Sequence, residues 1–90
     1  MEAVYLKVRL AVVEHHFRKA CQQIHHLNHR LSNLEQRYNK AKKEENRPFR
    51  YSLRLRIAVV DGLRDVYHEF AFRKAKESEY LKSAMVKLSC

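Results

Sequence analysis

The chain has 90 residues with a single glycine and a single proline, and 19 lysines and arginines against 10 acidic residues give a formal net charge of +9. A domain of this length buries only about 60–65% of the surface of its unfolded chain, which argues against a deeply enclosed active site. Sandwiches, barrels and phosphate-cradling loops need many more turn residues, so the composition argues strongly against these classes. The positive charge favours polyanionic or acidic partners.

The first half carries a heptad pattern that is typical of a long helix packed against another helix. Apolar or small residues recur at alternating steps of three and four, at Ala3, Leu6, Leu10, Val13, Phe17, Ala20, Ile24, Leu27, Leu31, Leu34, Tyr38 and Ala41. This spacing places all of them along one face of a helix, which we call the seam. We therefore expect a first helix over about residues 3–45.

A turn is expected where Pro48 interrupts this pattern. Proline removes a backbone N–H donor, and its ring disfavours helical geometry at the preceding residue, here Arg47. Polar Asn46 precedes both residues. The sequence therefore predicts a turn over residues 46–48, with the chain reversing at Arg47-Pro48.

The second half resumes an apolar stripe and predicts a helix over about residues 49–88. Its seam is expected at Phe49, Leu53, Ile57, Val60, Leu63, Tyr67, Phe70, Leu81, Ala84 or Met85, and Leu88. Lys74 and Glu77 interrupt the stripe, so this helix is expected to be less regular. Two arms of nearly equal length suit an antiparallel, coiled-coil-like hairpin, and we expect a mainly α fold with one domain over residues 1–90.

The hairpin prediction also specifies which residues face one another. The expected pairs are Leu53 with Ala41, Val60 with Leu34, Tyr67 with Leu27 and Leu81 with Val13. Gly62 would lie opposite Ser32, where a missing side chain allows two helices to approach closely; the alternative is a local kink in the helix without a function.

An α+β fold in the order βαβα is an open alternative. Residues 4–13 and 50–60 alternate between apolar and polar side chains and contain several β-branched residues, a pattern typical of strands. Residues 6–14 also match residues 53–61 position by position, as an internal repeat would. The helical spacing of apolar residues after Gly62 favours the all-helical fold, which is the preferred prediction.

Further apolar residues lie outside the expected seam on both helices. They include Val8, Val12, Leu55, Val59 and Val66. A second apolar stripe on a hairpin predicts self-association, and we expect a homodimer that forms a four-helix bundle. In an alternative function, a coiled-coil interaction module, these residues dock onto a partner protein.

The main functional signal is a basic cluster around the expected turn. Its members are Arg37, Lys40, Lys42, Lys43, Arg47, Arg50, Arg54 and Arg56. Phosphate backbones favour such a density of cations because each neutralised phosphate releases counterions. Tyr38, Phe49 and Tyr51 lie among the basic residues and offer rings that stack on unpaired bases. The sequence predicts binding of RNA or DNA, or of an acidic protein, at this end of the hairpin.

Neither catalysis nor metal binding is predicted. His25 and His29 lie four residues apart and Cys21 precedes His25 by four, but no second cluster supplies the remaining ligands of a structural zinc site. No motif of a hydrolase, a metalloprotease or a nucleotide-binding enzyme is present. We expect a protein that is not an enzyme and that uses no cofactor and no metal.

The sequence also lacks the features of a secreted or membrane-spanning protein. No apolar stretch approaches the roughly 20 residues of a spanning helix, and the N-terminal residues lack the basic start of a signal peptide. Cys21 and Cys90 cannot form a disulfide framework, although they formally allow a single bridge. We expect a soluble intracellular protein, in the nucleus or the cytoplasm.

Overall fold

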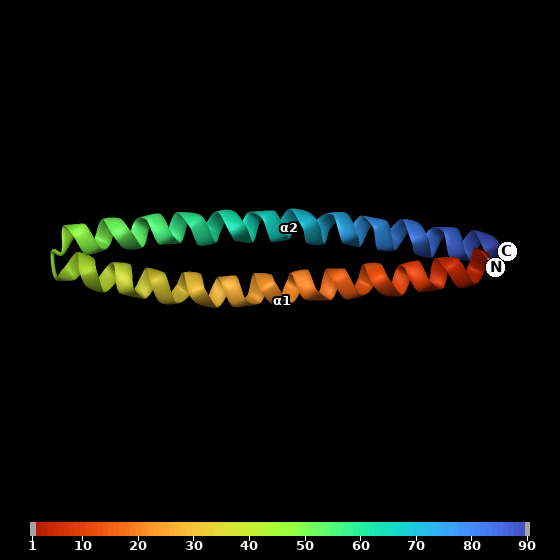
Figure 1. Cartoon of the computed structure of the whole chain (residues 1–90), viewed down its shortest axis with the longest axis horizontal. Coiled ribbons are helices and arrows are strands. Elements are labelled where there is room, and N and C mark those ends of the chain that lie inside the picture. The colour runs from red at the N-terminus through yellow and green to blue at the C-terminus, as the bar shows by residue number, and fades with distance from the viewer. Residues whose placement is uncertain (1, 90) are drawn as a thin grey trace.

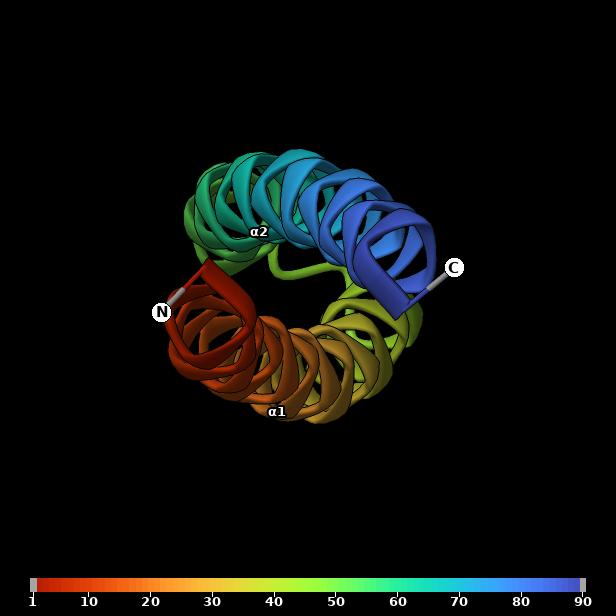
Figure 2. The same ribbon diagram turned by 90° about the vertical axis from the view of Figure 1, so that its right-hand side faces the viewer.

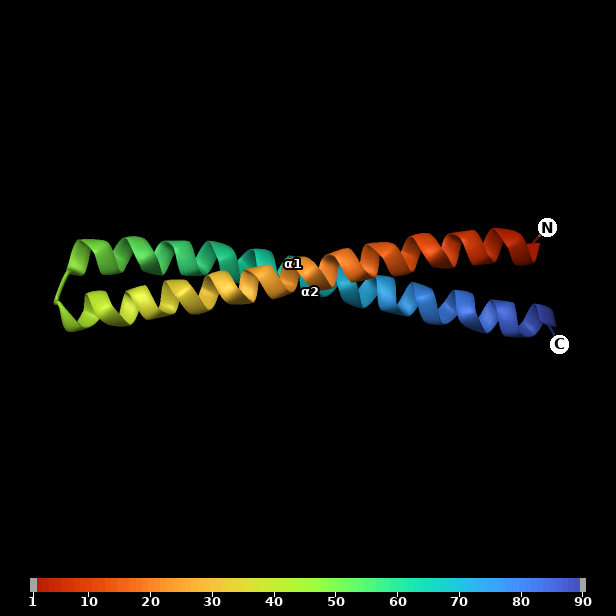
Figure 3. The ribbon, with the colours of Figure 1, turned by 90° about the horizontal axis from the view of Figure 1, so that it is seen from below.

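A computed structural model describes residues 2–89 as two long antiparallel helices joined by a short turn (Figure 1). Helix α1 spans Glu2–Lys43 and helix α2 spans Arg47–Ser89. The molecule is a rod with extents of 66 × 15 × 14 Å. The helices wind about one another when viewed along the rod (Figure 2) and cross near its middle when seen from below (Figure 3). The predicted helical hairpin is confirmed.

The alternative βαβα fold is wrong. Residues 4–13 lie within α1, residues 50–60 lie within α2, and the described residues contain no strand. The alternation has a helical explanation, because residues two apart on a helix point about 200° away from each other. Leu53 is fully buried, whereas Leu55 is 54% exposed. The apolar residues that suggested strands therefore belong to two different faces of a helix.

The seam predicted for α1 is the buried face of this helix. Its buried members are Val13, Ala20, Leu27, Leu31, Leu34 and Ala41. The half-buried members are Leu6, Leu10, Phe17, Ile24 and Tyr38, and Ala3 alone is exposed. Most residues of the first helix outside the seam are polar, so its buried face could be predicted from the sequence.

The continuous core lies in the half of the rod that ends at the turn. It contains Leu27, Leu31, Leu34, Ala41, Leu53 and Val60, with Tyr38, Ile57 and Tyr67 packed against them. Three of the four expected facing pairs fall within this cluster. Val13 and Leu81, the fourth pair, are both buried but lie outside it.

Along the middle of α2 the structure buries a different stripe from the one expected. Leu63 and Phe70 are 45% and 40% exposed. The covered positions that follow steps of three and four are Arg50, Leu53, Ile57, Val60, Arg64, Tyr67, Ala71, Lys74, Ser78, Leu81 and Met85, and the half-buried Ser52, Asp61, Ala75, Glu77 and Ala84 lie beside them. The heptad spacing of the second helix therefore continues without a break through Lys74. Polar residues occupy several of its seam positions, which is why its apolar pattern looked interrupted.

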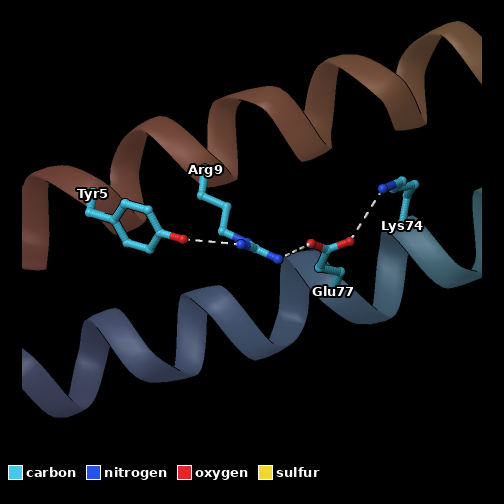
Figure 4. A network of polar contacts seen from close by, with 4 residues as sticks. All are labelled: Tyr5, Arg9, Lys74 and Glu77. Carbon is cyan, nitrogen blue, oxygen red and sulfur yellow. Dashed lines mark hydrogen bonds and ion pairs between the residues drawn. The ribbon is translucent and has the colours of Figure 1, made fainter.

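One of these polar positions belongs to a network between the helices (Figure 4). Arg9 donates hydrogen bonds to Tyr5 Oη and to Glu77 Oε1, both at 3.1 Å, and Lys74 Nζ donates to Glu77 Oε2 at 3.4 Å. Burial alone would raise the pKa of Glu77, but the hydrogen bonds from Arg9 and Lys74 outweigh it and the pKa is lowered. The hydrogen bonds to Tyr5 and Glu77 raise the pKa of Arg9.

Two other polar contacts join α1 to α2. Arg64, at a seam position, donates to Asn28 Oδ1 of α1 at 3.1 Å and to Asp61 Oδ1 of its own helix at 2.6 Å. Lys82 Nζ lies 3.7 Å from Glu14 Oε1. These contacts tie the two helices together beyond the apolar core.

The chain reverses over residues 44–46, ahead of the expected turn at Arg47-Pro48. Glu45 N donates to Lys42 O at 3.2 Å and Asn46 N donates to Ala41 O at 3.0 Å. This pair of bonds is the Schellman motif, which requires a left-handed residue directly after the C-cap, and the C-cap here is Glu44. Glu45 occupies that position with a φ of 56°.

Helix α2 begins at Arg47, so Pro48 lies in its first turn. Asn46 Oδ1 accepts a hydrogen bond from Phe49 N at 3.3 Å, and Asn46 O accepts one from Arg50 N at 3.0 Å. Asn46 is therefore the N-cap of α2. Proline fits the first turn because the N–H groups there have no partner within the helix. The proline starts the second helix, and the reversal precedes it.

Gly62 does not make the close approach that the hairpin prediction gave it. A Cβ atom built at Gly62 would meet nothing within 4 Å. The expected packing of Gly62 against Ser32 is therefore wrong, because Gly62 lies on the surface of α2.

Candidate nucleic-acid interface

The turn end of the rod gathers all eight residues predicted to bind nucleic acid. The end of α1 and the beginning of α2 lie side by side because the helices are antiparallel (Figure 1). We call this set the basic tip; it consists of Arg37, Lys40, Lys42, Lys43, Arg47, Arg50, Arg54 and Arg56. All are exposed except Arg50, which is half-buried.

The basic tip holds most of the excess charge of the chain. Residues 37–56 carry eight lysines and arginines against two acidic residues, Glu44 and Glu45, which leaves +6 of the total +9. The ion pairs of residues 2–89 join side chains of Arg9, Glu14 and the segment 61–82. Within residues 2–89, no member of the basic tip forms an ion pair. Its cations are therefore available to an external anion.

One flank of the basic tip is a groove of about 320 Å³ lined by three arginines and two tyrosines. The lining residues are Tyr38, Arg47, Arg50, Tyr51 and Arg54. Tyr51 is 65% exposed, whereas Tyr38 packs against the core. A guanidinium group binds a phosphate through two parallel hydrogen bonds, and an exposed tyrosine ring can stack on a base. This groove therefore combines phosphate and base-stacking groups.

A second groove of about 300 Å³ is lined by Arg30, Asn33, Leu34, Arg37 and Arg56. Arg54 and Arg56 line different grooves because residues two apart on a helix point in nearly opposite directions. No carboxylate lines either groove. Arg30 was not among the predicted residues. The heptad spacing from Arg30 to Arg37, which places both on one side of α1, would have indicated it.

The five residues predicted as a protein interface are all exposed but lie on two separate surfaces. Val8 and Val12 of α1 line a shallow groove that also includes Lys74 and Glu77. Leu55, Val59 and Val66 lie on α2, nearer the turn, and none of them lines that groove.

The six histidines are all exposed. The rings of His25 and His29 meet edge to face with 4.6 Å between their centroids. Within residues 2–89, no group of three or more His, Cys, Asp and Glu side chains is placed to hold a metal ion. Cys21 is exposed and free, and the bridge to Cys90 involves a residue outside the described range.

Comparison with known proteins finds no match to a protein-family model, a curated protein or a solved structure. Neither helix, over the part of the chain described, has an apolar stretch long enough to cross a membrane. The functional assignment therefore rests on the geometry and charge of the hairpin.

Proposed function

We propose that this protein is a non-enzymatic intracellular protein that binds the phosphate backbone of RNA or DNA through the basic tip. The observation that carries the proposal is the gathering of eight cations at one end of the rod, where none of them is neutralised by an ion pair within residues 2–89. Two arginine-lined grooves without a carboxylate contain five of these eight cations.

Arginine and lysine contacts to phosphates supply the affinity in this proposal. Phosphate contacts position a protein on nucleic acid and carry no sequence information by themselves. The cross-section of the rod, 15 × 14 Å, exceeds the roughly 12 Å width of the B-DNA major groove. The hairpin as a whole therefore rests against the backbone, and binding is expected to depend little on sequence.

The test is a titration of labelled RNA duplex, DNA duplex and single strand, followed by fluorescence anisotropy. If six phosphates are neutralised, the affinity should fall about 10³-fold between 50 and 200 mM salt. A higher affinity for the single strand than for the duplexes, with a shallower dependence on salt, would point to stacking on Tyr51. Binding that ignores salt, or an absence of binding at low salt, would refute the proposal.

Two double variants locate the contacts. Arg47→Gln with Arg54→Gln removes two positive charges from the groove that contains Tyr51. Arg37→Gln with Arg56→Gln removes two from the groove that contains Arg30. Each pair should lower the slope of log affinity against log salt by about 2, since one contact is worth about 1. The matched control, Arg18→Gln with Lys19→Gln, removes the same charge from exposed positions of α1 outside the basic tip. An equal loss in the control would refute a site at the tip.

A second candidate is an interaction module that docks a partner protein through α2. The exposure of Val59 and Val66, at 64% and 62%, favours it. In that case the arginine variants leave partner binding unchanged, whereas Val59→Asp abolishes it. An acidic partner at the basic tip would instead respond to the arginine variants, and competition by polyglutamate identifies that case.

A further inference from the structure

Helix α2 carries an exposed apolar stripe that α1 does not cover. Its members follow one another at steps of four, four, three and four, which keeps them on one side of the helix. They are Leu55, Val59, Leu63, Val66 and Phe70, and we call them the α2 stripe. Their exposed fractions run from 40% for Phe70 to 64% for Val59.

The α2 stripe is symmetric about the peptide bond between Gly62 and Leu63. Leu55 and Phe70 lie equally far from this bond along the helix, and so do Val59 and Val66. When a helix pairs with a second copy of itself in the antiparallel direction, a two-fold axis brings such residues together. With the axis at this bond, Leu55 faces Phe70 of the second copy and Val59 faces Val66 of the second copy.

Gly62 sits at the centre of this arrangement. Glycine in a helix interior is less favourable than alanine, and no neighbour in the hairpin requires the missing side chain, since a Cβ atom there would meet nothing within 4 Å. The absence of a side chain allows a second helix to approach closely at that point. Gly62 of one copy would approach Gly62 of the second copy, because both lie on the same side of the interface next to the two-fold axis.

The size of the stripe suits a reversible dimer. With about 150–250 Å² for each large apolar side chain, the exposed fractions leave about 500 Å² on each copy. Two copies together would bury at most about 1,000 Å² of apolar surface, which is the size of a weak, transient interface. We propose that the α2 stripe is covered by α2 of a second copy, antiparallel about a two-fold axis at Gly62-Leu63, to form a four-helix bundle.

This dimer is independent of the function of the basic tip, and sedimentation equilibrium of the full chain tests it without nucleic acid. The chain should show a reversible monomer–dimer equilibrium. Val59→Asp places a carboxylate in the stripe and should weaken the dimer at least tenfold. The matched control, Val4→Asp, changes a valine of α1 with the same 64% exposure and should leave the equilibrium unchanged. Circular dichroism verifies that both variants remain helical.

Gly62→Leu tests the register, because it adds a side chain where the two copies approach each other, whereas a Cβ atom there meets nothing within 4 Å in the hairpin itself. It should weaken the dimer severalfold without destabilising the hairpin. A chain that stays monomeric overturns the proposal, and so does a dimer that is insensitive to Val59→Asp. A dimer that Gly62→Leu leaves unchanged overturns the antiparallel register.

Discussion

Glu77 of α2 accepts a hydrogen bond from Arg9 of α1 at 3.1 Å, and this contact joins the two helices in the half of the rod that holds the chain ends (Figure 4). The continuous apolar core lies in the other half, next to the turn. The hairpin is therefore held by a continuous apolar core near the turn, and by smaller apolar contacts together with polar contacts towards the chain ends.

The Glu77 network predicts acid sensitivity of the open end. The pKa of Glu77 is lowered in the folded protein, so its contribution to stability is present above the unfolded pKa of about 4.3 and is lost as the pH falls through the lower folded value. Glu77→Gln should lower the melting temperature slightly at pH 7 and should reduce the loss of stability on acidification from the unfolded pKa through the folded pKa of Glu77. Thermal melts followed by circular dichroism from neutral to acidic pH measure both effects. Glu79→Gln, at an exposed position without an ion pair among residues 2–89, is the control and should not reduce the acid loss.

The left-handed residue of the turn predicts a stabilising substitution. Glu45 has a φ of 56°, a conformation that costs a residue with a side chain about 1–2 kcal/mol and glycine almost nothing. Glycine also makes the unfolded chain more flexible by about 0.4–1 kcal/mol, so Glu45→Gly should raise the free energy of unfolding by about 0.5–1 kcal/mol. Urea unfolding measures this. Glu44→Gly removes the same charge one residue earlier, where φ is not positive, and should destabilise; a gain in both variants would show that charge is the cause.

Asn46, the N-cap of α2, is predicted to stabilise the folded protein, so its replacement should lower stability. Asn46→Ala removes the side-chain acceptor of the Phe49 N–H and should cost about 1 kcal/mol. Asn39→Ala makes the same change at an exposed position inside α1, where alanine is the better helix former, and should be neutral or slightly stabilising. Equal losses in the two variants, measured by thermal unfolding, would contradict the capping role.

Two leucines that lie two residues apart are on different faces of α2, so replacing each with alanine should lower the free energy of unfolding by different amounts. Leu53 is fully buried, so Leu53→Ala should cost about 2–5 kcal/mol. Leu55 is 54% exposed, so Leu55→Ala should cost less than about 0.5 kcal/mol when unfolding is followed at high dilution, where self-association does not contribute. Similar costs at the two positions would be inconsistent with the hairpin.

Much of the first helix could be predicted from its residues alone. Its seam from Leu6 to Ala41 stands out against a polar background, and helical periodicity then identifies the face that packs. The clustering of cations around the turn was likewise visible, because a reversal of the chain necessarily brings the flanking segments together. The position of the reversal was off by two residues, since Pro48 was interpreted as part of the turn although proline is equally suited to the first turn of a helix.

Only the packing of the two helices decided which face of α2 is covered and where the grooves lie. The second helix has two apolar stripes, and neither periodicity nor composition shows which of them α1 covers. Leu63 and Phe70 are left outside because Arg64 and Ala71 occupy the covered positions, and burial depends on what lies opposite a residue. The division of Arg54 and Arg56 between two grooves has the same origin, because a groove exists only where residues of both helices meet.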